Sequence, residues 1–335
     1  MKKILAVVLA MVIGAAMTGC GGQTQTPTQP QTQTEKQDQT QNQTQNQTQT
    51  ENKQYKVGLS MNTQTNPFFV TVVEGCKKAA EEKGMEIFVT DAQDDAATQM
   101  KDIENLITKQ VDVMIIDPCD SDAIVAAVEA CNNAKIPVFT MDRESKGGEV
   151  VAHIGYDAIK SGKMAGEFLA KALNGKGNVV ELQGIMGTNV AQNRSEGFNS
   201  IMKENPDIKI VACQTANFDR SQGMSVMENI LQANEKIDGL YAANDEMLLG
   251  ALEAIQAAGR QDEIIMIGCD ALDETLAGIK EGKINATIAE PPFFLGKAMI
   301  NTAYDYLSGQ KIETRVILKN QLVDKNNIDT IKTRD

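Results

Sequence analysis

The feature that most constrains the fold is an alternation of short apolar runs with amphipathic segments, from Tyr55 to about Leu307. The amphipathic segments carry apolar residues at helical spacing, as Met100, Ile103 and Ile107 do. Strands that alternate with helices in this way predict parallel sheets covered on both faces. The expected strands are Tyr55–Met61, Met85–Thr90, Val111–Ile116, Ile136–Met141, Val150–Gly155, Asn178–Leu182, Ile208–Gln214, Gly239–Ala243, Ile264–Gly268 and Ala286–Ala289.

The alternation falls into two series, and the second begins with a helix-like segment at Ala158. Two such series in tandem predict an α/β protein with two doubly wound parallel-sheet lobes. In sheets of this type, ligands bind beyond the carboxyl ends of the strands. The polar and aromatic residues that follow the expected strands are Asn66, Phe68, Phe69, Asp117, Asp142, Arg143, Arg194, Phe218, Asp219, Arg220, Asn244, Asp245, Asp270 and Glu290.

This mixture of side chains suits a neutral, polyhydroxylated ligand. Carboxylates accept hydrogen bonds, guanidinium groups donate them in pairs, and amides do both, which matches adjacent sugar hydroxyls. The phenylalanine rings offer faces for the apolar side of a sugar ring. Two plainer interpretations remain open. Asp and Asn at these positions are also common helix caps, as we expect for Asp219 and Asp245, and Phe at a helix start commonly packs in the core.

The motifs NPFF, DR, R, FDR, NDEM and TIA occur in this order, together with the longer segments DSDAIVAAVEACNNAKIPV and VVAHIGYD. With them the chain resembles the ribose-binding proteins, type I periplasmic binding proteins that serve as sugar-binding subunits of ABC importers. The resemblance runs from Tyr55 to the C-terminus. It implies two lobes joined by a three-stranded hinge, with crossovers near Tyr156, Glu290 and Lys319. The implied lobes are 55–156 plus 291–319 and 157–290 plus 320–335.

The resemblance also implies which residues bind the ligand. It assigns Asn66, Phe68, Phe69, Asp142, Arg143, Arg194, Phe218, Asn244 and Asp270. The chain departs from the family pattern at four positions, with Asp117 in place of Asn, Tyr156 in place of Ser, Cys269 in place of Phe and Glu290 in place of Gln. We include Asp117, Tyr156 and Glu290 among the expected ligand-binding residues. Because two of the departures add carboxylates, a cyclic polyol or an amino sugar is the alternative to ribose or a related pentose or hexose.

The N-terminal residues read as a targeting segment. Lys2 and Lys3 precede the apolar run Ile4–Met17, which is shorter than the about 20 residues that span a bilayer. The run ends at Met-Thr-Gly-Cys20, which resembles the lipobox of bacterial lipoproteins. We therefore expect a signal peptide over 1–20, lipidation of Cys20 and an extracytoplasmic protein anchored to the cell membrane. Ordinary secretion, with Cys20 as a free thiol, is the alternative.

Residues 21–54 consist almost entirely of Gln, Thr, Asn and Pro. Such a segment has too few apolar residues to offset the entropy of ordering, so we expect a disordered tether. As a flexible coil it would reach roughly 30 Å, enough to hold a globular body near a membrane.

Composition excludes several classes of function. A net charge of −13 opposes binding to nucleic acid. No dinucleotide-binding or P-loop glycine motif occurs, and the single histidine, His153, lies within an apolar run, so we expect no cofactor, no catalytic residue and no enzyme. Apart from Cys20, the five cysteines form no CxxC pair and no zinc-type spacing, so we expect no metal site and four buried thiols.

The sequence therefore predicts a monomeric solute-binding protein that closes on a monosaccharide and delivers it to ABC permease subunits. A sugar sensor that presents its ligand to a chemoreceptor or sensor kinase is the second hypothesis, and it differs only in the partner. Repressors with a similar two-lobe core carry a DNA-binding segment where this chain has its targeting segment and tether.

Overall fold

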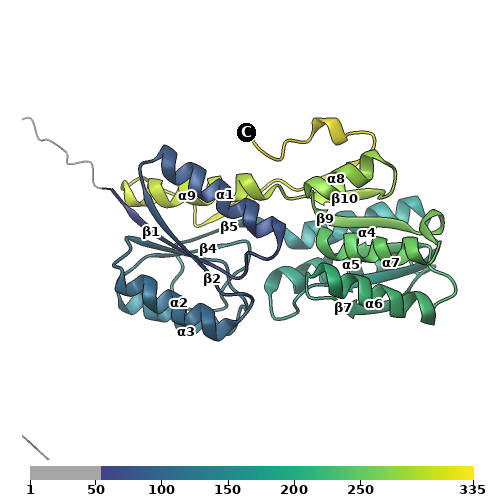
Figure 1. The fold of residues 1–335 in the computed structure, drawn as a ribbon, viewed down its shortest axis with the longest axis horizontal. Coiled ribbons are helices and arrows are strands. Elements are labelled where there is room, and N and C mark those ends of the chain that lie inside the picture. Colours follow the sequence, from purple (N-terminus) through teal and green to yellow (C-terminus); the bar gives the residue numbers. More distant parts are fainter. Residues whose placement is uncertain (1–53) are drawn as a thin grey trace, which may run out of the picture. The chain divides into compact units, whose positions relative to one another are not determined.

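The computed structural model describes residues 54–335, and two six-stranded sheets organise this part of the chain (Figure 1). The first sheet has the order β11-β5-β4-β3-β1-β2, and all its strand pairs are parallel. Its strands are β1 (Lys56–Met61), β2 (Glu86–Asp91), β3 (Val113–Ile116), β4 (Val138–Met141), β5 (Ala152–Tyr156) and β11 (Arg315–Leu318).

The second sheet has the order β12-β10-β9-β8-β6-β7, in which only β12 runs antiparallel to its neighbour. Its strands are β6 (Gly177–Gln183), β7 (Ile208–Thr215), β8 (Gly239–Ala242), β9 (Ile265–Asp270), β10 (Ala286–Ala289) and β12 (Gln321–Asp324). The predicted fold class, two parallel-sheet α/β lobes, is confirmed.

Helices cover both sheets. Those of the first lobe are α1 (Pro67–Glu82), α2 (Ala96–Thr108), α3 (Val125–Asn133) and α9 (Pro292–Leu307). Those of the second lobe are α4 (Ala158–Ala172), α5 (Asn189–Glu204), α6 (Arg220–Ala233), α7 (Asp245–Ala257) and α8 (Asp273–Lys280). Short 3₁₀ turns occupy Gln261–Glu263 and Ile328–Thr330.

Local sequence explains where α1 begins. The Asn66 side chain accepts a hydrogen bond from the Phe68 amide at 2.8 Å, which satisfies one free donor of the first turn. Pro67 occupies the first helical position, where a proline loses no intrahelical hydrogen bond. These two residues therefore mark the start of α1 at Pro67.

Apolar clusters lie on both faces of the first sheet, one under α1 and α9 and one under α2 and α3, and a further cluster fills the second lobe. Every residue of β3, β4, β8 and β10 is buried. Continuous burial of this kind is expected for parallel strands with helices on both faces. The apolar runs of the sequence therefore form the centres of the sheets.

The chain passes between the two sheets after β5, after β10 and again between β11 and β12. Helix α9, although it follows a strand of the second sheet, packs beside α1 in the first lobe (Figure 1), where the Cys76 thiol donates to the Gly296 carbonyl at 3.5 Å. The strands β11 and β12 were not predicted. Only Lys319 and Asn320 separate them, and no helix lies between, so they fall outside the alternation of strands and helices on which the prediction rests.

The expected signal peptide, the lipidation site Cys20 and nearly all of the expected tether lie outside the described residues. Within 54–335, no helix combines the length and the apolar character needed to cross a bilayer.

Candidate ligand-binding site

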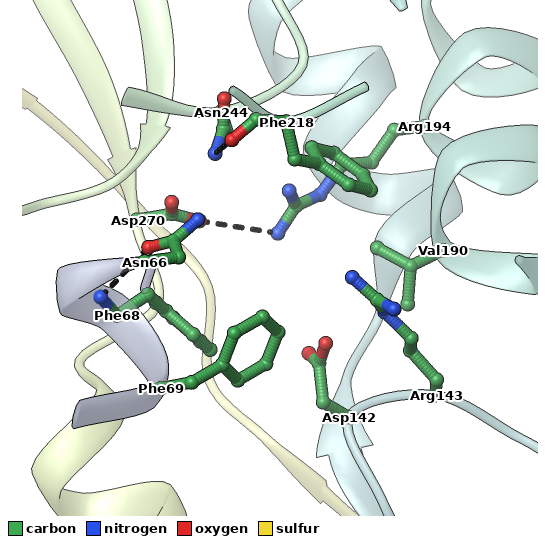
Figure 2. Close-up of a pocket in the computed structure, with 10 residues that line it drawn as sticks. All are labelled: Asn66, Phe68, Phe69, Asp142, Arg143, Val190, Arg194, Phe218, Asn244 and Asp270. Carbon is green, nitrogen blue, oxygen red and sulfur yellow. Dashed lines mark hydrogen bonds and ion pairs between the residues drawn. The ribbon is translucent and has the colours of Figure 1, made fainter. Parts of the chain in front are cut away.

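A cavity at the carboxyl ends of the strands takes its walls from both lobes (Figure 2). Its empty volume, which includes solvent space at its opening, is about 280 Å³. The residues that line it are Asn66, Phe68, Phe69, Asp142, Arg143, Val190, Arg194, Phe218, Asn244 and Asp270. Val190 alone among them was not predicted, because an aliphatic side chain at a helix start carries no sign of binding.

Three of these residues have left-handed backbone conformations. The φ angles are 58° at Asp142, 59° at Phe218 and 128° at Asp270. Asp142 directly follows β4, and Asp270 is the last residue of β9, so the chain turns sharply where each strand ends. A left-handed backbone conformation costs of order 1–3 kcal/mol in a residue other than glycine, and such conformations tend to occur at functional sites.

The guanidinium group of Arg143 lies between aromatic rings of the two lobes. Its central carbon is 5.3 Å from the ring centroid of Phe69 on α1 and 5.7 Å from that of Phe218, which precedes α6. Attraction between the cation and the ring faces holds it there. One terminal nitrogen donates to the Pro118 carbonyl at 3.1 Å, whereas Nε is buried and has no hydrogen-bond partner among residues 54–335.

A second guanidinium group, that of Arg194 on α5, faces the cavity from the other lobe. Nη1 donates to the Ala243 carbonyl at 2.6 Å, and Nη2 contacts Asp270 at 3.4 Å and Glu290 at 2.5 Å (Figure 2 draws the Asp270 contact). Its Nε is likewise buried without a partner in the described chain. Contacts of the terminal nitrogens therefore fix both guanidinium groups, while the Nε donor of each has no acceptor among the described residues.

Aromatic rings line the cavity from both lobes. Phe68 and Phe69 meet edge to face at 5.2 Å between centroids. From the second lobe, Phe218 lies over Gly184, where a Cβ atom would come within 2.0 Å of the ring. Only glycine leaves room for Phe218 in this position. All three rings are also members of the apolar clusters, so they are both core residues and cavity walls.

Burial controls the acidity of the cavity carboxyls. It raises the pKa of Asp142 and, to a greater extent, that of Asp270, while the positive charge of Arg194 opposes the rise at both. In the ionised state each carboxylate accepts hydrogen bonds, and Arg194 contacts that of Asp270 at 3.4 Å.

Three residues that we expected to bind the ligand do not line this cavity. Both carboxylate oxygens of Asp117 are buried without a partner among the described residues, and burial raises the pKa of Asp117 well above its usual range. The Tyr156 hydroxyl donates to the Pro291 carbonyl at 3.0 Å. Glu290 binds Arg194 and is not among the residues that line the cavity. These are also the departures from the ribose-binding pattern that add a carboxylate or a ring.

We expected Asp219 and Asp245 to cap the helices that follow them. Asp219 caps α6 by accepting from the Gln222 amide at 2.8 Å, as predicted. The same prediction for Asp245 is wrong, because Asn244 is the cap of α7. Asp245 is instead buried and accepts from the Leu272 amide at 2.9 Å, which fixes the chain after β9.

Hydrogen bonds join the lobes directly beside the cavity. The Asn189 side chain at the start of α5 accepts from the Glu144 amide at 2.9 Å and donates to the Glu144 carboxylate at 3.2 Å. The Ser121 amide donates to the Gly187 carbonyl at 3.1 Å. The structure therefore shows the two lobes closed on each other.

No histidine or cysteine side chain of residues 54–335 lines the cavity. His153 is buried in β5 beside the Thr140 hydroxyl at 3.0 Å, and burial lowers its pKa to about 4, as expected for a structural histidine. Four of the five described cysteines are buried, as predicted. Cys269, Asp270 and Glu290 place ligand atoms within 4.8 Å of one another, but Arg194 already supplies a positive charge to both carboxylates.

Comparison with known proteins identifies the class. Residues 57–311 match the model of the periplasmic binding protein domain family. The ribose import binding protein of Bacillus subtilis is 40% identical over 264 residues, which is 79% of this chain and 85% of the relative. The chain belongs to the periplasmic binding protein domain family. Within it, the chain belongs to the ribose-binding-like group, whose members are sugar-binding transport proteins and not enzymes.

Solved structures of solute-binding proteins agree with this family assignment. A Bacillus halodurans ABC transporter solute-binding protein with bound myo-inositol matches with a TM-score of 0.79 and 33% identity, over 83% of this chain and 96% of that one. An Actinobacillus succinogenes periplasmic solute-binding protein with bound D-allose matches with a TM-score of 0.78 and 30% identity, over 83% of this chain and 100% of that one.

Proposed function

We propose that this chain captures a neutral monosaccharide, with ribose as the leading candidate, and delivers it to the permease of an ABC importer. The observation that carries the proposal is the cavity whose walls come from both lobes. A ligand in it contacts both lobes only when they are closed, so binding shifts the equilibrium toward the closed form. The closed form is then the one that the permease recognises.

The polar groups favour a ligand that donates and accepts at the same time. The buried Nε atoms of Arg143 and Arg194 need acceptors, because a buried donor without a partner costs about 1–3 kcal/mol. The carboxylates of Asp142 and Asp270 need donors. Sugar hydroxyls supply both. They satisfy these donors and acceptors without bringing a charge into a buried cavity, so an uncharged ligand fits the cavity best.

The aromatic residues favour a ring with an apolar face. Phe68 and Phe69 approach from the first lobe and Phe218 from the second, all three at the cavity wall. The C–H face of a sugar ring packs against such rings, while its hydroxyls point to the charged groups.

Ribose leads because the nine cavity residues assigned by the ribose-binding pattern are all present, and because relatives include ribose import binding proteins. A cyclic polyol or an amino sugar is the alternative, and the related structure with myo-inositol supports the polyol. Presentation of the ligand to a chemoreceptor or sensor kinase remains the alternative to transport.

We expect one member of a panel of ribose, allose, xylose, galactose, myo-inositol and glucosamine to bind with micromolar or tighter affinity. At about 1 mM, a ligand with a Kd of about 1 µM stabilises the folded protein by about 4 kcal/mol. Thermal unfolding with each compound measures this, and calorimetry then gives the Kd of the best ligand. Unfolding curves that coincide across the panel would contradict the proposal.

We further propose that the protein is a monomer anchored outside the cytoplasm by a lipid on Cys20, with residues 21–54 as the tether. The support is the sequence alone: an apolar run followed by Met-Thr-Gly-Cys. The full chain expressed in a bacterial host should partition into the membrane fraction, and Cys20→Ala should remove the lipid. Equal membrane partitioning of both forms, with no lipid on Cys20 by mass spectrometry, would rule the anchor out.

A further inference from the structure

The Glu290 carboxyl group is the point at which the hinge meets the ligand site. Glu290 follows β10 at the second crossover and is only 1% exposed. Its side chain does not line the cavity. It contacts Arg194, which does line the cavity.

All three crossover segments contribute to the surroundings of this carboxylate. Ser161, which lies in the first turn of α4 after the first crossover, donates its hydroxyl to Oε1. Asn320, between β11 and β12 at the third crossover, donates to the same oxygen at 2.8 Å and to the Ser161 hydroxyl at 2.6 Å. Glu290 itself lies at the second crossover. The other oxygen, Oε2, binds Arg194 at 2.5 Å.

A buried carboxylate with these contacts fixes its partners strongly. Removing one member of a buried ion pair is costly, because it leaves the other charge without compensation. Hydrogen bonds between charged groups are also about twice as strong as neutral ones. The orientation of the Arg194 guanidinium group, and with it the direction of its spare Nε donor, therefore depends on where the hinge segments hold Glu290.

We propose that Glu290 is a positioning residue that couples the hinge to the ligand: it orients Arg194 for the sugar only when the three crossovers have their closed arrangement. The inference rests on the proposed function, and it assigns Glu290 a role without ligand contact. It also gives a reason for glutamate at a position where the ribose-binding pattern has glutamine. A neutral amide binds the guanidinium group less strongly.

The first test is Glu290→Gln, which keeps the shape of the side chain and removes its charge. We expect the affinity for the best sugar to fall about 10- to 100-fold, as for the loss of a charged hydrogen bond. Glu181→Gln is the matched control. Glu181 is a buried glutamate of the second lobe, bound to Asn199 at 2.9 Å, that contacts neither the hinge residues nor the cavity. Its replacement should leave the affinity unchanged.

A double-mutant cycle separates positioning from a general structural effect. Arg194→Lys will itself weaken binding, but in that background Glu290→Gln should cause no further loss beyond about twofold. Equal losses from Glu290→Gln in the wild-type and Arg194→Lys backgrounds would overturn the inference, as would an unchanged affinity in the single variant. Absence of sugar binding by the wild-type protein would instead contradict the proposed function, and the inference with it.

If Glu290→Gln does not fold, Asn320→Ala provides the same test from the hinge side. It removes one donor to the Glu290 carboxylate without touching Arg194 or the cavity. We expect a loss of affinity of several-fold that disappears in the Arg194→Lys background. A loss that persists there, or no loss at all, would count against the coupling.

Discussion

Replacing Arg143 by alanine should lower the affinity for the sugar about 100-fold or more. The guanidinium group is held between Phe69 and Phe218 and by the Pro118 carbonyl, with Nε left to donate to a ligand. Its loss removes one or two charged hydrogen bonds of about 1.5–3 kcal/mol each. It also removes the group that spans the aromatic rings of both lobes. Calorimetric titration with the best ligand of the panel measures the effect.

Two further variants make the Arg143 experiment specific. Arg143→Lys keeps the charge but loses the planar fork, so it should still bind at least about 10-fold more weakly than the wild type. Arg260→Ala removes a partly buried arginine of the second lobe that does not line the cavity and pairs with Glu263 at 2.9 Å, and it should bind normally. Wild-type affinity in Arg143→Ala would show that the cavity is not the sugar site.

The fold could be predicted largely because the central strands are continuous apolar runs. Strands such as β3 and β10 are buried on both faces, so their burial is visible in the sequence. Where a proline and a capping residue mark a boundary, as before α1, the boundary could be predicted as well. The strands β11 and β12 could not, because no helix separates them and the alternation of strands and helices therefore gives no sign of them.

The candidate site could be predicted as a set of residues but not as a geometry. The position of Asp142 directly after a strand, and that of Asp270 at a strand end, place both at the cavity, as the rule for parallel sheets requires. The direction of the Glu290 side chain could not be read in the same way. It depends on Ser161 and Asn320, which are far from it in sequence and meet it only when the hinge is assembled.

The close packing of α4 on α5 leads to the second large effect, which we expect for Gly162→Val. A Cβ atom at Gly162 would lie 2.0 Å from the Arg194 carbonyl oxygen and 2.8 Å from the Phe198 amide nitrogen. Backbone atoms cannot rotate away as a side chain can, so α5 must shift. Overpacking of this kind costs about 3 kcal/mol, which corresponds to a decrease in Tm of roughly 6–12 °C.

The same substitution should weaken sugar binding, because the residue whose backbone must move is Arg194 itself. We expect both a lower Tm without ligand and a smaller increase in Tm when the sugar is added. Lys163→Val introduces the same side chain at the next, exposed position of α4 and controls for the helix propensity of valine. A Gly162→Val protein that melts like Lys163→Val and binds sugar like the wild type would show that α4 and α5 are not packed as closely as the structure has them. The orientation of Arg194 would then have to be set by its contacts with Glu290, Asp270 and the Ala243 carbonyl.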